Sequence, residues 1–187
     1  MEIDIAATPP ARIDLGDLVV RRWRLDDVDS RLGALIDSHE HLHQWMAWAA
    51  EPPTREDQRL SIEISSTRWP TPGGGYLYGI FTAAGEVVGG IGLHDRVAAG
   101  ALEIGYWCHV AHTGRGVVTR AARALTAAAL ALPHIERVEI RCDAANVRSA
   151  AVPRRLGYRL VETGVRAAEA PCDSGRYQVW ATTAHGS

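Results

Sequence analysis

The sequence of 187 residues contains no lysine, and all 20 of its basic residues are arginine. A Walker-type phosphate loop needs a lysine, so that class of nucleotide-binding site is excluded. Cysteine is also scarce. The three cysteines are Cys108, Cys142 and Cys172, an odd number at distant positions and without a CxxC pair. Neither a disulfide framework nor a structural zinc site is therefore expected.

Long apolar runs are missing as well. The longest apolar helix candidate ends near Leu132 and is interrupted by Arg120 and Arg123, so it does not span a bilayer. The N-terminus lacks a basic segment followed by an apolar core, and no signal peptide is expected. A formal net charge of −2 gives no overall attraction to nucleic acid or to a membrane surface. We expect a cytoplasmic protein that binds neither.

The composition that remains is typical of a globular protein, with 47% hydrophobic and 22% charged residues. It predicts a single domain over residues 1–187, with enough length for a full hydrophobic core. Periodicity predicts strands at residues 18–24, 76–82, 87–94, 102–110, 138–143, 158–162 and 177–182. It predicts helices at residues 26–36, 39–48, 54–65, 117–132 and 146–156, and a loop at 70–75. This order of elements indicates a mixed α/β domain.

The most informative segment is the predicted strand Leu102–Val110 with the turn Ala111–Thr119 after it. This turn contains Gly114-Arg-Gly116 and opens a predicted helix. A helix N-terminus carries unpaired N–H groups and the positive end of the helix dipole, so such a junction can bind phosphate. A Rossmann site is disfavoured because Thr119 stands where its third glycine would be. An ordinary helix-entry turn is the alternative.

A second segment follows at the right distance. It contains Asn146-Val-Arg-Ser149 and then Leu156-Gly-Tyr158. Together with the strand Glu-Ile-Gly-Tyr-Trp and its glycine turn, it resembles the GNAT acyl-CoA transferases, in particular the RimJ/RimL-type ribosomal-protein N-terminal acetyltransferases. The resemblance extends over most of the chain, including Arg22–Asp27 and His41–Trp48.

The resemblance implies an α/β GNAT fold, with a central mixed, mostly antiparallel, splayed sheet flanked by helices. It implies an N-acetyltransferase that moves an acetyl group from acetyl-CoA to a primary amine by direct transfer in a ternary complex. A protein N-terminus and a small-molecule amine both fit as acceptor, and a homodimer is compatible. The alternatives are a non-catalytic acyl-CoA-binding or sensing module, and a transferase that uses a larger acyl-CoA such as succinyl-CoA.

In the family, backbone N–H groups of the glycine turn hold the pyrophosphate of CoA, and the end of the preceding strand pairs with the pantetheine arm. The usual loop pattern is Gln/Arg-x-x-Gly-x-Gly/Ala. Here Gly116 is kept, while Thr113 and Val118 depart from the pattern. The residues expected at the cofactor are Trp107, His109, Val110, Thr113, Gly114, Arg115, Gly116, Val117, Val118, Thr119, Asn146, Ser149 and Arg155. For Arg115 and Arg155, a solvated surface position is the alternative.

Two residues are candidates for proton transfer. A substrate amine is mostly protonated near neutral pH, since its pKa is about 8 to 10, and Glu103 is the expected general base. Its alternative is an ion pair with an arginine of a neighbouring strand. Ser149 is the expected general acid for the departing CoA thiolate. Its alternative is helix capping, with Asn146 as N-cap. Pro153 leaves the Ser149 carbonyl without an intrahelical donor.

The acceptor is expected to contact Trp45, Trp48 and Glu103, with Trp69 as a further aromatic candidate, and core packing is the alternative for the tryptophans. Cys108 beside the thioester is a candidate nucleophile for a ping-pong route, and a small buried residue is its alternative. The run His39-Glu-His41-Leu-His43 places only two imidazoles on one helix face, so no metal is expected.

Overall fold

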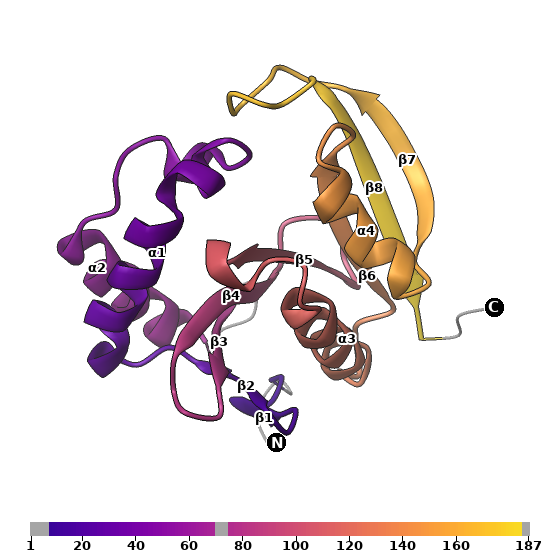
Figure 1. Cartoon of the computed structure of the whole chain (residues 1–187). Coiled ribbons are helices and arrows are strands. Elements are labelled where there is room, and N and C mark those ends of the chain that lie inside the picture. The colour runs from indigo at the N-terminus through magenta and orange to yellow at the C-terminus, as the bar shows by residue number, and fades with distance from the viewer. Residues whose placement is uncertain (1–7, 70–74, 185–187) are drawn as a thin grey trace.

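The computed structural model describes residues 8–69 and 75–184, within which eight strands form one sheet in the order β1-β2-β3-β4-β5-β6-β8-β7 (Figure 1). The strands are β1 (Arg12–Asp14), β2 (Leu18–Arg22), β3 (Tyr76–Thr82), β4 (Val87–His94), β5 (Ala101–Cys108), β6 (Arg137–Asp143), β7 (Arg159–Val165) and β8 (Arg176–Thr183). In this sheet only β5 and β6 run parallel. The predicted mixed, mostly antiparallel sheet is confirmed. The expected loop at 70–75 lies, apart from Gly75, outside the described residues.

Four α-helices lie within the described residues: α1 (Val28–His43), α2 (Arg55–Arg68), α3 (Val117–Leu130) and α4 (Val147–Arg155). Short 3-10 helices occur at η1 (Leu25–Asp27), η2 (Ala47–Ala49) and η3 (Val110–His112). In Figure 1, α1 and α2 lie on one side of the central strands and α3 lies on the other, while α4 lies beside β6. None of the described helices combines the length and the apolar character that crossing a membrane requires.

Side chains of the sheet alternate between two hydrophobic cores, as the pleat of a strand requires. In β2, Val20 belongs to the core that contains Leu125 of α3. Its neighbour Val19 belongs to the core that contains Leu35 of α1 and Ile62 of α2. The sheet is thus covered by helices on both faces, and each face of β2 is buried.

The sheet splits between β5 and β6. The two strands pair only at Ala101, Leu102 and Glu103, opposite residues 137–139. From Ile104 to Cys108, β5 pairs with β4, and its other edge has no strand partner among the described residues. The rest of β6 pairs with β8 alone. The splayed strand that the resemblance implied is present, and it leaves an open backbone edge just downstream of Glu103.

Two expectations about the N-terminal elements were wrong. The helices expected at residues 26–36 and 39–48 are one helix, α1, because no glycine or proline interrupts the chain between Ile36 and His39. After His43 the chain turns and forms only the short η2. Strand β1 was not expected, because three residues are too few for an alternating pattern to be recognised.

Candidate active site

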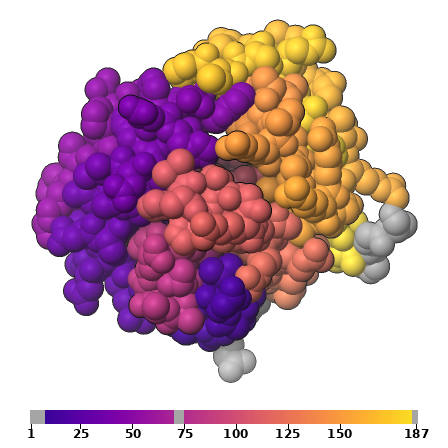
Figure 2. Space-filling model, viewed as in Figure 1, coloured from indigo at the N-terminus to yellow at the C-terminus, as the bar shows by residue number. Residues whose placement is uncertain are grey.

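Two cavities meet at the split between β5 and β6. The first, of about 450 Å³, lies against the N-terminus of α3, and we call it the donor cavity. The second, of about 510 Å³, lies between α1, β4, β5 and the end of β6, and we call it the acceptor cavity. Figure 2 shows the surface hollowed where the indigo and purple N-terminal region meets the orange residues near α4. Six residues line both cavities: Trp45, Met46, Tyr106, Trp107, Asn146 and Ser149.

The donor cavity is bounded by the glycine turn. Gly116 is the N-cap of α3 and has φ 75°, a left-handed conformation that glycine adopts without strain. A Cβ at this position would meet nothing within 4 Å, so the conformation, and not lack of space, is what requires glycine. In the described part of the chain, none of the backbone N–H groups of residues 114–119 donates a hydrogen bond. These donors and the dipole of α3 form an anion-binding end.

Most of the residues expected at the cofactor line the donor cavity. They are Trp107, Thr113, Gly114, Gly116, Val117, Val118, Thr119, Asn146, Ser149 and Arg155. Three expected residues line neither cavity: His109, Val110 and Arg115. The backbone N–H of His109 continues the β4–β5 pairing by donating to Val88 O at 3.0 Å, and that of Val110 donates to Ser38 Oγ of α1 at 3.0 Å. Because the Val110 N–H is already bonded, the strand edge open to a ligand ends at Cys108.

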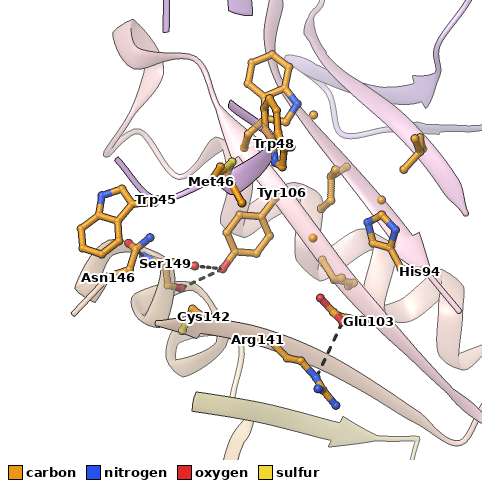
Figure 3. Close-up of a pocket in the computed structure, with 18 of the residues that line it drawn as sticks. Trp45, Met46, Trp48, His94, Glu103, Tyr106, Arg141, Cys142, Asn146 and Ser149 are labelled. Atoms are coloured by element: carbon orange, nitrogen blue, oxygen red, sulfur yellow. Dashed lines mark hydrogen bonds and ion pairs between the residues drawn. The ribbon is translucent and has the colours of Figure 1, made fainter. Parts of the chain in front are cut away.

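Glu103 lies in the acceptor cavity on β5 with 7% of its surface exposed. Its carboxylate accepts from Arg96 Nη2 at 2.6 Å and from Arg96 Nε at 3.0 Å. Arg141 Nε of β6 lies 4.0 Å from Glu103 Oε2 (Figure 3). The ion pair that was the alternative role for Glu103 is present, and its principal partner comes from the β4–β5 loop. The carboxyl group held in this way lies at the cavity wall.

His94 of β4 is the residue opposite Glu103 in the β4–β5 register, and it also lines the acceptor cavity (Figure 3). Its ring packs over Gly105, where a Cβ would lie 3.1 Å from His94 Nε2. The glycine of the Glu-Ile-Gly motif thus makes room for this imidazole. Burial and the nearby Arg96 lower the pKa of His94, so the ring is neutral at pH 7. The sequence gives no signal for a role of His94, because no motif or spacing along the chain links His94 with Glu103.

Ser149 lies in the first turn of α4, where both cavities meet. Asn146 caps this helix by accepting from the Ser149 N–H at 3.0 Å. The Tyr106 hydroxyl donates to the Ser149 carbonyl at 3.0 Å and lies 3.1 Å from Ser149 Oγ (Figure 3). Pro153 leaves that carbonyl without an intrahelical donor, and Tyr106 of β5 supplies the missing one. The free Ser149 carbonyl is predictable from the sequence, but its hydrogen bond with Tyr106 is not.

Two cysteines lie close to the junction. Burial raises the pKa of both Cys108 and Cys142 to about 11. Each is therefore a protonated thiol at neutral pH, which is a poor nucleophile. Cys108 Sγ lies 3.8 Å from Val88 O in the adjoining strand. This environment favours the small buried residue over the covalent route for Cys108.

The tryptophans have different positions. Trp45 lines both cavities, and Trp48, with 59% of its surface exposed, lines the acceptor cavity. Trp69 lies in the core, where its ring packs edge-on against Tyr76 and Tyr78, and it lines neither cavity. Trp69 thus has the packing role that was the alternative for the tryptophans.

The histidine run of α1 is arranged as its spacing predicted. The rings of His39 and His43 lie 5.9 Å apart, and His41 instead lines the donor cavity. Among the described residues, no group of three or more His, Cys, Asp or Glu side chains is placed to hold a metal ion.

A family model described as Acetyltransferase (GNAT) domain matches residues 17–159, well over half of the chain. The chain belongs to the GNAT acetyltransferase family. A Bacillus subtilis (strain 168) protein named "Putative ribosomal N-acetyltransferase YdaF" is 29% identical over 143 residues, which cover 75% of this chain and 77% of the relative. "Probable N-acetyltransferase YjcK" of the same organism is 29% identical over 146 residues, covering 75% and 80%.

Solved structures of the same fold are similar over nearly the whole chain. The RimL ribosomal L7/L12 alpha-N-protein acetyltransferase in complex with coenzyme A has a TM-score of 0.84 and 21% identity, covering 94% of this chain and 99% of its own. The Microcin C7 self immunity acetyltransferase MccE, in complex with acetyl-CoA and AMP, has a TM-score of 0.84 and 21% identity, covering 96% and 99%. At these identities the similarity shows the GNAT fold. Family membership makes this protein an acetyltransferase with acetyl-CoA as its acetyl donor.

Proposed function

We propose that the protein transfers an acetyl group from acetyl-CoA directly to a primary amine, with both substrates bound at once. The observation that carries this proposal is the meeting of the two cavities at Tyr106, Trp107 and Ser149. A donor in one cavity and an amine in the other would touch there, so no covalent enzyme intermediate is needed. The high pKa of the Cys108 thiol supports the same conclusion.

The donor cavity has the features that CoA requires. The free N–H groups of residues 114–119 cradle the pyrophosphate with the α3 dipole behind them. The unpaired edge of β5 up to Cys108 receives the pantetheine arm, and its N–H groups polarise the thioester carbonyl. Asn146 lines the same wall, and its free amide N–H₂ bonds the arm while its oxygen caps α4.

Glu103 removes the proton from the bound ammonium, directly or through a water molecule. Its two arginine partners hold the carboxylate in place while leaving it at the cavity wall. His94, neutral at pH 7 and opposite Glu103, is a second proton acceptor on the same wall. The amine nitrogen that results is the nucleophile.

Ser149 protonates the departing CoA sulfur. Tyr106 has one proton, and that proton bonds the Ser149 carbonyl, so the contact between the two hydroxyls uses the Ser149 proton. When negative charge grows on the sulfur, the Ser149 proton passes to it, and the Tyr106 hydroxyl proton turns from the Ser149 carbonyl to the serine oxygen, 3.1 Å away, and stabilises its negative charge. Burial raises the pKa of Tyr106, so the phenol stays protonated throughout.

The similar proteins support a protein N-terminus as acceptor, since YdaF is named a ribosomal N-acetyltransferase and RimL acts on ribosomal protein L7/L12. A protein acceptor of that kind supports a cytoplasmic enzyme. The acceptor cavity, with Trp45 and Trp48 at its wall, accommodates a peptide end or a small amine.

The test measures release of free CoA thiol from acetyl-CoA with peptides, free amino acids and aminoglycosides as acceptors. We expect release only when an amine is present, and a fall in kcat/KM of about 10²- to 10⁴-fold for Glu103→Gln. The matched control is Glu63→Gln. Glu63 of α2 is also ion-paired, with Arg59, but both residues lie outside the two cavities, so this variant keeps wild-type turnover.

Other outcomes contradict parts of the proposal. Tight acetyl-CoA binding without release for any amine identifies a sensing module. Faster turnover of succinyl-CoA identifies a different acyl donor. A burst of acyl-enzyme before steady state contradicts direct transfer.

A further inference from the structure

Among the described residues, one arginine of the acceptor cavity has no counter-ion. Arg31 of α1 lines this cavity, and its Nη2 donates to Ser61 Oγ at 3.3 Å. Its guanidinium also lies 5.0 Å from the ring of Trp23. Nε and Nη1 are both buried and have no hydrogen-bond partner in the described part of the chain. A cation that lines the cavity thus has three or more donor hydrogens without an acceptor.

The other arginines of the same cavity are paired. Arg96 bonds Glu103, Arg141 bonds Glu139 at 2.9 Å, and Arg166 bonds Asp173 at 2.9 Å. Among the described residues, Arg31 is the arginine of this cavity without a carboxylate. The lack of a carboxylate partner is therefore particular to Arg31 and is not a general property of the arginines in this cavity.

An unpaired buried cation is strongly destabilising unless a partner supplies the opposite charge. Burial lowers the pKa of Arg31 to about 10, which still leaves the group charged at pH 7. A ligand in the cavity can supply the missing negative charge. An arginine with unsatisfied hydrogen-bond donors is suited to bind a carboxylate, because charge-assisted hydrogen bonds from a guanidinium group are strong and directional.

At the end of β6 the unsatisfied group is a hydrogen-bond acceptor. Asp143 lines the same cavity and is buried, and its Oδ1 accepts from Ser174 Oγ and from the Ala145 N–H. Its Oδ2 is buried without a hydrogen-bond partner. The cavity thus contains unsatisfied donors on α1 and an unsatisfied acceptor on β6. A ligand that carries both an ammonium and a carboxylate would satisfy both.

We propose that Arg31 is a carboxylate-binding residue of the acceptor site, and that the acceptor is an amine that also carries a carboxylate. This inference rests on the proposed acetyl transfer and specifies its substrate class. Two sources share the chemistry: the α-carboxylate of a free amino acid, and an acidic side chain near the N-terminus of a peptide. Arg31 binds and positions the acceptor, and Glu103 performs the proton transfer.

The first experiment needs no variant. Turnover by the wild-type enzyme is compared between free amino acids and their amides, and between peptides with Asp or Glu near the N-terminus and the same peptides with Asn or Gln. We expect the carboxylate form of at least one pair to have a kcat/KM higher by about 10- to 100-fold. The pair that shows the preference identifies the source. Equal kcat/KM in every pair, or a preference for a phosphorylated amine, overturns the proposal.

The second experiment uses Arg31→Gln, with Arg55→Gln as control. Arg55 is an exposed arginine at the start of α2 that pairs with Asp29 outside both cavities. For the carboxylate acceptor, Arg31→Gln should raise KM by about 10- to 100-fold and leave kcat and the acetyl-CoA Kd unchanged. For the amide acceptor, KM should not change. A purely structural role for Arg31 predicts equal losses with both acceptors, and that result contradicts the proposal.

Arg31→Lys keeps the charge and provides a folded variant if Arg31→Gln is unstable, with KM values between those of wild type and Arg31→Gln expected. The two proposals fail in different ways. Absence of CoA release with every amine contradicts acetyl transfer itself. Turnover without a preference for carboxylate acceptors contradicts only the role of Arg31.

Discussion

The donor cavity and the acceptor cavity share six lining residues but are built from different parts of the protein. The donor cavity includes the glycine turn, the first turn of α3 and the open edge of β5, which offer backbone N–H groups. The acceptor cavity includes charged side chains from α1, the β4–β5 loop, β5 and β6. Backbone donors are the same in any sequence that adopts the turn, whereas a pattern of charged side chains is particular to one protein.

This difference explains which departures from the family pattern matter. Thr113 and Val118 line the donor cavity in place of the usual residues. The Val118 N–H remains available, whereas the Thr113 N–H donates to Val110 O, so the change at Thr113 alters a side chain and not a free donor. At the acceptor end, loss of one charge changes the balance of the others, because Arg96 and Arg141 both contact Glu103. We therefore expect the donor end to tolerate side-chain changes and the acceptor end to be sensitive to them.

The largest effect is expected where the two cavities meet. Ser149→Ala removes the proposed acid and should lower kcat by about 10²-fold or more at pH 7, with the acetyl-CoA Kd unchanged. The deficit should shrink as the pH rises above the pKa of a thiol, about 8.5, because the leaving thiolate then needs no proton. Steady-state CoA release between pH 6.5 and 9 measures it.

Ser30→Ala is the matched control, since Ser30 also lies in the first turn of a helix, α1, and bonds Asp27 O at 3.0 Å outside both cavities. The Ser149 N–H still bonds Asn146 in the Ser149→Ala variant, so α4 keeps its cap. A kcat equal to that of the control would remove Ser149 from the mechanism and leave Tyr106 as the acid to test.

A smaller effect tests the claim that the donor end depends on backbone. Gly116→Ala places a Cβ on a left-handed residue at a cost of about 1–2 kcal/mol, and should raise the acetyl-CoA Kd by about 10-fold. Arg115→Ala, which alters an exposed side chain outside the cavity, should leave the Kd unchanged. Isothermal titration calorimetry measures both.

Gly16→Ala separates strain from binding. Gly16 also has a positive φ, 83°, with nothing within 4 Å of an added Cβ, and lies in the turn between β1 and β2. The variant should lose as much stability as Gly116→Ala and keep the wild-type Kd. If Arg115→Ala weakened binding more than Gly116→Ala, the donor end would depend on side chains after all.

The smallest effect concerns stability against pH. Burial, and then Arg96, lower the pKa of His94 below its usual 6.5. Between the folded and unfolded pKa values the unfolded chain therefore binds a proton that the folded protein does not. The free energy of unfolding should fall as the pH drops below 6.5, by at most about 1.4 kcal/mol per pH unit for this group.

Urea unfolding from pH 7.5 to 5.5 measures this slope, and His94→Asn should make it shallower. His41 is a second contributor of the same sign, because burial and Arg148 lower its pKa, so His41→Asn is the comparison. An unchanged slope in His94→Asn would show that His94 is hydrated in solution and does not pack against Gly105 as described.

The sequence by itself determined the parts of the protein that depend on neighbouring residues. The glycine turn at Gly116, the cap at Asn146 and the free carbonyl caused by Pro153 all follow from contacts within a few residues. Hydrophobic periodicity gave most strands, since an alternating pattern over seven or eight residues is unambiguous. It predicted a break within α1 that is absent, because no glycine or proline lies between Ile36 and His39 and the helix continues through Asp37 and Ser38.

Only the tertiary structure decided the chemistry of the acceptor end. Tyr106 reaches the Ser149 carbonyl across 43 residues of sequence. Arg31 lies in the same cavity as Glu103 because α1 packs against the face of the sheet from which Trp107 of β5 projects. The same packing buries Nε and Nη1 of Arg31 without a carboxylate partner among the described residues. The sequence shows which charges are present, but the charges that remain unpaired depend on distances that only the folded chain sets.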